Sequence, residues 1–276
     1  MSKSGSLYIH KPSPLHQLDG SIKFLLLITW TVFVFMFMDI RIFTAMIVLG
    51  FGLLKIAQIE YKSIRPLLLF VIVFTLFNSL FLILITPSYG SELAGTSHRL
   101  VDIFGRPLTT ETLFFALTLS FKYIAILPVT FLFIFTTHPS KFASSLNRLG
   151  VSYKVAYAIN IALRYIPDVQ DEMQNIINAQ EARGIPFKKG DAPFFTRFKN
   201  HITIVVPMLI SSLNRIEVVS NAMELRGFGR HKTRSWYGRE KFTKKDLMWF
   251  VFALGLIPVG IYLKHKGMNL FWYPFK

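Results

Sequence analysis

The sequence predicts an all-α polytopic membrane protein with about five transmembrane helices and long amphipathic cytoplasmic helices. Three features support this: long apolar runs, a net charge of +16 placed mainly between them, and a short motif that occurs twice at the ends of amphipathic segments. Of the 276 residues, 52% are hydrophobic and 28 are phenylalanine. Concentrated apolar runs of this kind indicate bilayer-spanning helices rather than a soluble core.

The apolar runs define the predicted spans. A hydrocarbon core needs about 20 predominantly apolar helical residues, in a range of about 17–25. Five segments meet or approach this length: Ile22–Met38, Ile42–Ile59, Leu67–Ile85, Leu113–Phe135 and Leu247–Leu263. The second is the weakest, because Lys55 and Gln58 lie near its end. We expect the first to be retained, since its apolar run is too long for a signal peptide and no small-residue cleavage site follows.

The distribution of basic residues predicts the topology. Residues 136–245 carry 18 lysines and arginines against 8 acidic residues, a net of +10. We expect a multi-pass protein of the cell membrane. Because cytoplasmic loops carry an excess of Lys and Arg, its N-terminus and residues 136–245 are predicted to lie on the cytoplasmic side. The predicted organisation is therefore residues 1–137 with about four spans, a cytoplasmic region of amphipathic helices at 138–245, and a last membrane helix and tail at 246–276. The basic run at 229–245 is expected to meet anionic lipid headgroups rather than nucleic acid.

A short motif is repeated within the predicted cytoplasmic region. "NAQEARGIP" from Asn178 and "NAMELRGFG" from Asn221 share asparagine, alanine, glutamate, arginine and glycine in register. Each copy ends a predicted amphipathic helix, so the glycine is explained as a helix stop. An arginine in the last turn also complements the helix dipole.

Capping alone does not require the other matching positions. Two similar helix ends suit two similar acceptor sites, such as two grooves on a dimeric partner, and the planar guanidinium binds a carboxylate through two parallel hydrogen bonds. Glu181 and Glu224 would either hold a basic group of the partner or solvate the helix. The candidate docking residues are Glu181, Ala182, Arg183, Gly184, Glu224, Leu225, Arg226 and Gly227.

Other polar residues suggest no chemistry of their own. The chain has no cysteine, its seven histidines have no metal-ligand spacing, and it has no G-x-x-x-x-G-K-[ST] loop for ATP. No cofactor or metal is therefore expected in this chain. Within the predicted spans, Lys122 is expected to snorkel or to pack against polar groups, and Asn78 to form an interhelical hydrogen bond.

These residues resemble a known family. The stretch "LHQLDGSIKFLLL" is similar to the start of the first span in energy-coupling factor (ECF) transporter T components, the EcfT/CbiQ group. "HPSKFASSLNRLGVSYKVAYAINIALRYIPDVQDEMQNIINAQEARG" and "PMLISSLNRIEVVSNAMELRGFG" resemble the runs into the family's two Ala-Arg-Gly motifs. Ala182-Arg183-Gly184 matches the motif in full, whereas Leu225 replaces its first alanine in the second copy.

The resemblance implies a non-enzymatic scaffold of an ATP-driven importer. Its coupling helices would seat their ends on two ABC-type ATPase subunits, which bind the ATP, and it would hold a separate substrate-binding membrane S component for a vitamin or a metal ion. The apolar stripes at Val169–Ile177 and Leu209–Met223 would pack against each other or against that component. The alternatives are a stand-alone secondary transporter, which calls for polar residues clustered at midplane, and an integral-membrane lipid-processing enzyme, which needs acidic or His/Glu clusters at a membrane face.

Overall fold

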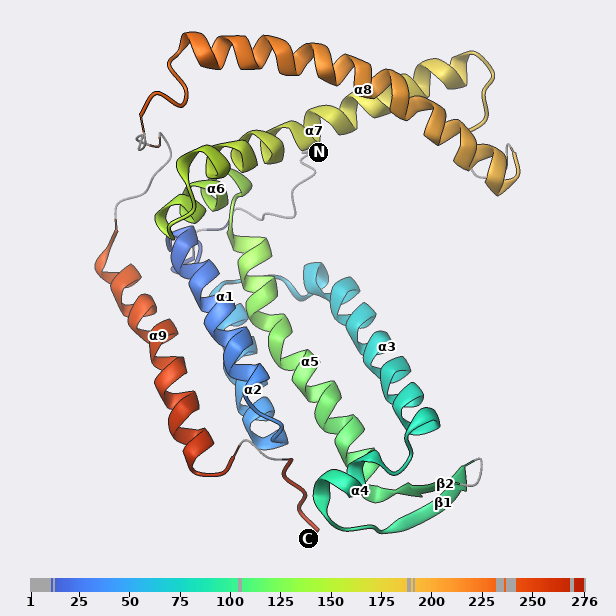
Figure 1. The fold of residues 1–276 in the computed structure, drawn as a ribbon, viewed down its shortest axis with the longest axis vertical. Coiled ribbons are helices and arrows are strands. Elements are labelled where there is room, and N and C mark those ends of the chain that lie inside the picture. The colour runs from blue at the N-terminus through green and yellow to red at the C-terminus, as the bar shows by residue number, and fades with distance from the viewer. Residues whose placement is uncertain are drawn as a thin grey trace. The chain divides into compact units, whose positions relative to one another are not determined.

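A computed structural model describes residues 11, 13–103, 106–187, 190, 192–231, 236, 242–268 and 271–275. The helices are α1 (Gly20–Phe35), α2 (Ile40–Ile56), α3 (Tyr61–Ile85), α4 (Tyr89–Ala94), α5 (Thr110–Thr136), α6 (Pro139–Arg148), α7 (Tyr153–Ala182), α8 (Phe194–Leu225) and α9 (Lys244–His265). Two strands, β1 (Arg99–Ile103) and β2 (Arg106–Thr109), pair in an antiparallel manner. The chain divides into two compact units, one containing α6–α8 and the other containing the remaining elements (Figure 1).

The all-α fold class is confirmed, with one small addition. The antiparallel strands and the short α4 occupy the segment between α3 and α5, for which the sequence predicts only a loop. That segment carries no clear alternation of apolar and polar residues, so its strands have no period-2 signal. The hairpin contacts the start of α5 and does not enter the helical core.

The predicted spans correspond to helices with shifted ends. The weakest, Ile42–Ile59, is the 17-residue α2, which ends at Ile56 because Gln58 has a positive φ of 56°. The helices α3, α5, α8 and α9 are long and apolar enough to cross a membrane, and α1 is a shorter apolar helix. Length and composition alone therefore also allow α8 to span, so its predicted location outside the bilayer stays a prediction.

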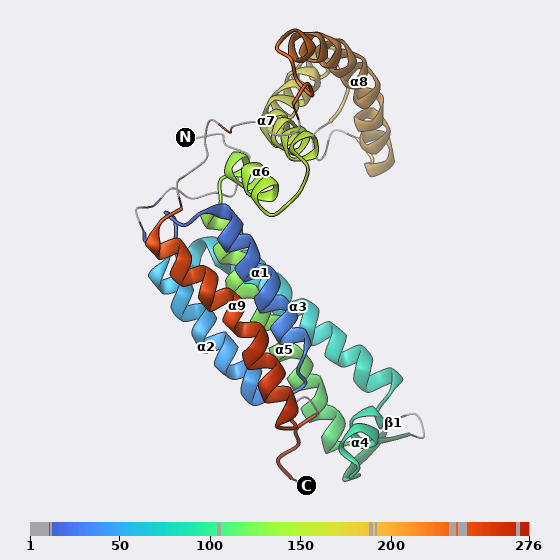
Figure 2. The same cartoon turned by 60° about the vertical axis from the view of Figure 1, so that its left-hand side comes forward.

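In the larger unit, α5 is the central helix (Figures 1 and 2). It packs against α1, α2 and α3, while α9 packs on the other side of α1. The core between these helices includes Trp30, Phe33 and Phe43. Trp30 is fully buried and its indole N–H donates to the Ala125 carbonyl at 2.9 Å, so this polar group is satisfied within an apolar core.

Hydrogen bonds between α3 and α5 come from serine rather than from the predicted asparagine. Ser79 contacts the Ser120 hydroxyl at 3.2 Å and the Ala116 carbonyl at 3.5 Å. Asn78 is half-buried, and its side chain makes no hydrogen bond to another helix among the described residues, so the prediction of an interhelical bond from it is wrong. One residue along a helix turns the side chain by about 100°, which places Ser79 and not Asn78 against α5.

The lysine in the middle of α5 lies against apolar groups. Lys122 places its ammonium 3.7 Å from Met38 Sδ and 4.8 Å from the centroid of the Phe35 ring. The expected packing of Lys122 against polar groups is therefore not seen among the described residues. Its ammonium instead makes a cation–π contact with Phe35. Met38 belongs to the short turn between α1 and α2, so Lys122 lies at the depth where that helical hairpin turns.

A buried polar cluster joins the ends of three helices in the same unit. Asp19 caps α1 by accepting from the Ser21 N–H, and its own N–H donates to Asp246 Oδ1 at 3.0 Å. Asp246 forms the capping box of α9 with Thr243. Lys23, only 2% exposed, donates to the Thr136 carbonyl at the end of α5 at 2.9 Å. The motif "LDGSIKF" therefore ties α1 to both α9 and α5.

Replacing Asp246 tests this cluster. Asp246→Ala removes the cap of α9 and leaves the buried Asp19 N–H without its acceptor, which should lower the free energy of unfolding by about 2–4 kcal/mol. Asp102→Ala, at an exposed acid on β1, should change it by less than about 0.5 kcal/mol. Thermal unfolding of both variants in detergent measures the difference, and equal melting temperatures would contradict the proposed role of the cluster.

Candidate docking site at two helix ends

The first copy of the motif ends α7 with a six-residue hydrogen-bonded turn. Gly184 has φ +82°, and its N–H donates to the Glu181 carbonyl at 2.9 Å. The Ile185 N–H donates to the Gln180 carbonyl at 3.1 Å, which completes a Schellman motif. Arg183 is the C-cap residue and its side chain is exposed.

The second copy ends α8 with the same geometry. Gly227 has φ +70° and donates to the Glu224 carbonyl at 2.8 Å, and the Phe228 N–H donates to the Met223 carbonyl at 2.9 Å. Arg226 is again the exposed C-cap residue, and Leu225 beside it is 90% exposed. Each arginine is therefore presented to solvent at a rigid helix end.

Glycine at these ends is a general stop signal in this chain. The same pair of hydrogen bonds closes the helices before Gly150 and Gly267, neither of which follows an arginine directly. The prediction that glycine ends the helices is confirmed. What distinguishes the ends of α7 and α8 is the exposed arginine at the cap.

Each end is fixed to the start of the other long helix. After the first end, the Pro186 carbonyl accepts from the Asn200 side chain at 2.9 Å, and the ring of the buried Phe187 lies 5.2 Å from that of His201. Both partners are in the first turns of α8.

The second end is fixed in the same manner to the start of α7. The Phe228 ring lies 5.2 Å from that of Tyr153 and 5.1 Å from that of Tyr157. Both tyrosines are in the first two turns of α7, which is continuous up to Ala182. Rotation of either end about its helix would break these aromatic contacts, so the direction of each arginine is fixed by packing.

This arrangement separates the two arginines instead of bringing them together. The helices α7 and α8 cross as an antiparallel pair (Figure 1). Arg183 ends α7, whereas Arg226 ends α8 beside the start of α7, where Phe228 contacts the two tyrosines. From Tyr157 to Ala182, α7 rises by about 40 Å at 1.5 Å per residue. The smaller unit therefore carries two similar ends about one long helix apart.

Side chains of opposite charge hold the crossing of α7 and α8. Glu172 accepts from the Ser211 hydroxyl at 2.6 Å and from Arg215 at 2.7 Å, and the Arg215 guanidinium lies 5.9 Å from the centroid of the Tyr165 ring. The hydrogen bond from Ser211 and the charge of Arg215 lower the pKa of Glu172. These contacts join the second half of α7 to the second half of α8.

The apolar stripe of α8 faces away from α7. Ile204 is buried and Ser211 and Arg215 face α7, whereas Leu209, Leu213 and Ile216 are 55%, 63% and 61% exposed. The expectation that the two stripes pack against each other is therefore wrong for the α8 stripe, and packing against another subunit stays a prediction. Serine and arginine hold the crossing instead, which leaves the apolar residues free for another partner.

Sequence reasoning missed the aromatic residues that fix the ends. Phe187 and Phe228 follow the two glycines by three residues and by one residue, so the only available signal was a phenylalanine shortly after each stop. Their partners His201 and Tyr153 lie 14 and 75 residues away in the sequence and could not be inferred from spacing. Among the other candidate residues, Glu181 is half-buried and Glu224 is exposed.

Comparisons with known proteins identify the family. A model of the family CbiQ, described as cobalt transport protein, matches residues 11–236. The chain belongs to this family. The resemblance to ECF transporter T components is confirmed by relatives that are named as transporter proteins rather than enzymes. The energy-coupling factor transporter transmembrane protein EcfT of Staphylococcus aureus is 25% identical over 95% of this chain and 97% of its own length. EcfT of Lactococcus lactis is 26% identical over 88% and 91%. EcfT of Leuconostoc gelidum is 32% identical over 52% of this chain and 56% of its own length.

The contact of Glu172 at the crossing should depend on pH. Its pKa is lower when folded than when unfolded, so its stabilisation is present above the ordinary glutamate pKa of 4.5 and is lost as pH falls through the lower folded value. Glu172→Ala should speed amide exchange in the second halves of α7 and α8 several-fold at pH 7, as measured by hydrogen exchange with mass spectrometry. Asp171→Asn, at an exposed neighbouring acid, should have no such effect, and equal exchange in the two variants would contradict the assignment.

Proposed function

We propose that this chain is the coupling subunit of an ECF-type ABC importer and that it transmits ATP-driven motion to a separate substrate-binding membrane subunit. The observation that carries the proposal is the pair of exposed arginines at the rigid, equivalent ends of α7 and α8. Membership of the CbiQ family and the names of the EcfT relatives support it.

The two ends suit two ATPase subunits. Each arginine would form a bidentate ion pair with a carboxylate in a groove of one ATPase, and the separation of about one helix length would place one end on each subunit. The ATPases would bind ATP, so this chain needs no nucleotide site of its own. We propose that α6–α8 and the N-terminus lie on the cytoplasmic side, where those subunits would meet them.

Motion would pass through the α7–α8 crossing. Closure of the ATPase dimer would draw the two ends toward each other. Because Glu172 and Arg215 join the helices ten residues before the last residue of each, the ends would move as levers about that point. The exposed apolar stripe of α8 would receive the substrate-binding subunit. That subunit would select a vitamin or a transition-metal ion, and the description of the family as cobalt transport proteins favours a metal ion.

Co-purification tests the proposal at its simplest. The full chain is solubilised from native membranes under mild conditions and its partners are identified by mass spectrometry. We expect a P-loop ATPase and a second polytopic membrane protein to purify with it. Purification without any P-loop ATPase would favour a stand-alone secondary transporter or a lipid-processing enzyme instead.

Charge reversal tests the role of the arginines. Loss of one interfacial charge pair costs about 2–5 kcal/mol, so Arg183→Glu or Arg226→Glu should each weaken ATPase binding at least about 30-fold, and the double variant should abolish binding and transport. Membrane insertion should be unchanged because both side chains are exposed.

A third arginine provides the matched control. Arg164 is exposed on α7 between its ends, so Arg164→Glu should retain ATPase binding and transport. If the double variant at the ends retained both activities, the arginines would serve only as helix caps. If Arg164→Glu abolished binding equally, general charge rather than the two ends would explain the effect.

A further inference from the structure

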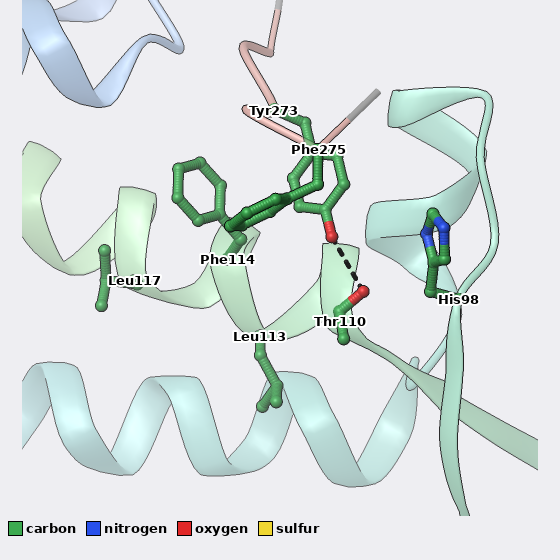
Figure 3. Close-up of a pocket in the computed structure, with 7 residues that line it drawn as sticks. All are labelled: His98, Thr110, Leu113, Phe114, Leu117, Tyr273 and Phe275. Carbon is green, nitrogen blue, oxygen red and sulfur yellow. Dashed lines mark hydrogen bonds between the residues drawn. The ribbon is translucent and has the colours of Figure 1, made fainter.

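A pocket with one polar end lies beside the first turns of α5 in the larger unit. It has a volume of about 510 Å3 and is lined by His98, Thr110, Leu113, Phe114, Leu117, Tyr273 and Phe275 (Figure 3). This size is within the range of small-molecule sites, which combine apolar walls with a few placed polar groups. No role of this pocket follows from the coupling function.

The C-terminal tail builds one wall of the pocket. Phe271 and Tyr273 are buried, and both rings lie within about 6 Å of the Phe114 ring, at 6.0 and 5.6 Å. Between them, Trp272 lies over the Arg41 guanidinium at 4.3 Å. The tail is therefore packed in place, and it holds the Tyr273 hydroxyl 2.8 Å from Thr110 Oγ1.

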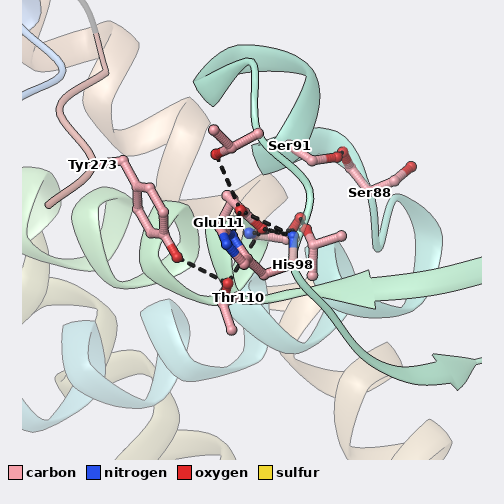
Figure 4. A network of polar contacts seen from close by, with 9 residues as sticks. Ser88, Ser91, His98, Thr110, Glu111 and Tyr273 are labelled. Carbon is pink, nitrogen blue, oxygen red and sulfur yellow. Dashed lines mark hydrogen bonds and ion pairs between the residues drawn. The ribbon is translucent and has the colours of Figure 1, made fainter. Parts of the chain in front are cut away.

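A buried carboxylate fixes the polar end of the pocket. Glu111 is fully buried and accepts hydrogen bonds from the His98 N–H, His98 Nδ1, Thr96 Oγ1 and Thr110 Oγ1 (Figure 4). Because an ionised carboxylate only accepts, His98 Nδ1 and the Thr110 hydroxyl must both donate to it.

These directions determine what the polar end offers to a ligand. The single proton of Thr110 is used on Glu111, so the Tyr273 hydroxyl must donate to Thr110 Oγ1 and has only its lone pairs left. His98 donates to Glu111 through Nδ1, and in the neutral form of the ring Nε2 is left as an acceptor. The polar end thus presents acceptors, and a ligand must bring O–H or N–H donors.

The pocket is polar at one end and apolar at the other, in the same order as the head groups and acyl chains of a membrane leaflet. Its polar residues gather at the start of α5: Thr110 is the first residue of this helix, His98 directly precedes β1, and Tyr273 bonds to Thr110 from the C-terminal tail. Leu113 and Leu117 lie further along this long apolar helix. Thr110 and Leu117 are about 10 Å apart along the helix axis. An acyl chain along the leucines would place a lipid head group beside Tyr273 and His98.

We propose that this pocket binds a membrane phospholipid whose head group carries hydroxyl or ammonium donors, with one acyl chain along Leu113 and Leu117. Phosphatidylglycerol and phosphatidylethanolamine have this chemistry. Phosphatidylcholine does not, because its quaternary ammonium has no proton to donate. The proposal requires only a multi-pass membrane protein, so it stands or fails independently of ATPase coupling.

Native mass spectrometry of the purified full chain tests the lipid preference. Delipidated protein in detergent is mixed with equal amounts of the three phospholipids that share the same acyl chains. We expect phosphatidylglycerol and phosphatidylethanolamine to be retained about fivefold more than phosphatidylcholine, which is the affinity ratio that one additional hydrogen bond gives. Glycerol and ethanolamine, which have no acyl chain, should not compete at the same concentrations. Equal retention of all three lipids would overturn the proposal.

Two variants locate the bound lipid, with one matched control. Tyr273→Phe removes the acceptor and should reduce retention of the two donor lipids to the level of phosphatidylcholine, whereas Tyr262→Phe, at a 59% exposed tyrosine of α9, should not. Leu117 is 46% exposed, so Leu117→Trp should fold and should displace the acyl chain from the pocket, reducing retention of all three lipids. Unchanged lipid retention in either Tyr273→Phe or Leu117→Trp would contradict the assignment of the site.

Discussion

The packing of each long helix end against the start of the other long helix is the constraint on which the candidate docking site depends. Phe228 on Tyr153 and Tyr157, and Phe187 on His201, convert two separate helix stops into the two ends of one antiparallel pair. Without these contacts, the C-cap arginines would have defined backbone geometry but no defined position relative to each other. With these contacts, the two copies of the motif hold their arginines about one helix length apart, and a partner with two sites would recognise this spacing.

Within this unit the α7–α8 crossing is held by polar side chains, whereas the helix ends are held by aromatic contacts. Glu172, Ser211 and Arg215 join the second halves of the two helices through polar contacts, and the apolar stripe of α8 stays exposed among the described residues of the same unit. A soluble protein rarely exposes so many large apolar side chains along one helix face. The same stripe makes α8 apolar enough to qualify as a membrane span by length and composition. A surface that binds another membrane protein would be similarly rich in apolar residues.

Much of the fold could be predicted because its signals are local. Apolar runs gave the helices, and glycine after arginine gave the ends of α7 and α8. The contacts that join distant segments had no such signal. Asp19 and Lys23 lie in the stretch that resembles the start of the family's first span, but nothing in that stretch indicates that they bind Asp246 and Thr136, more than 100 residues away. The aromatic tail after α9 looked like a simple terminus, yet Phe271 and Tyr273 are buried against α5. A residue's distant partner is set by how the helices pack, and spacing along the chain does not encode it.

The most direct test of the account is a distance between the two arginine ends. Because the chain has no native cysteine, spin labels can be attached at Ala182→Cys and Leu225→Cys alone and measured by pulsed electron paramagnetic resonance. The account predicts a single narrow distribution at about 40 Å in the full-length protein. It also predicts that Phe228→Ala broadens this distribution, because the second end loses its contact with Tyr153 and Tyr157. A short distance, or a distribution already broad in the protein with Phe228 intact, would show that the two ends do not form one rigid pair.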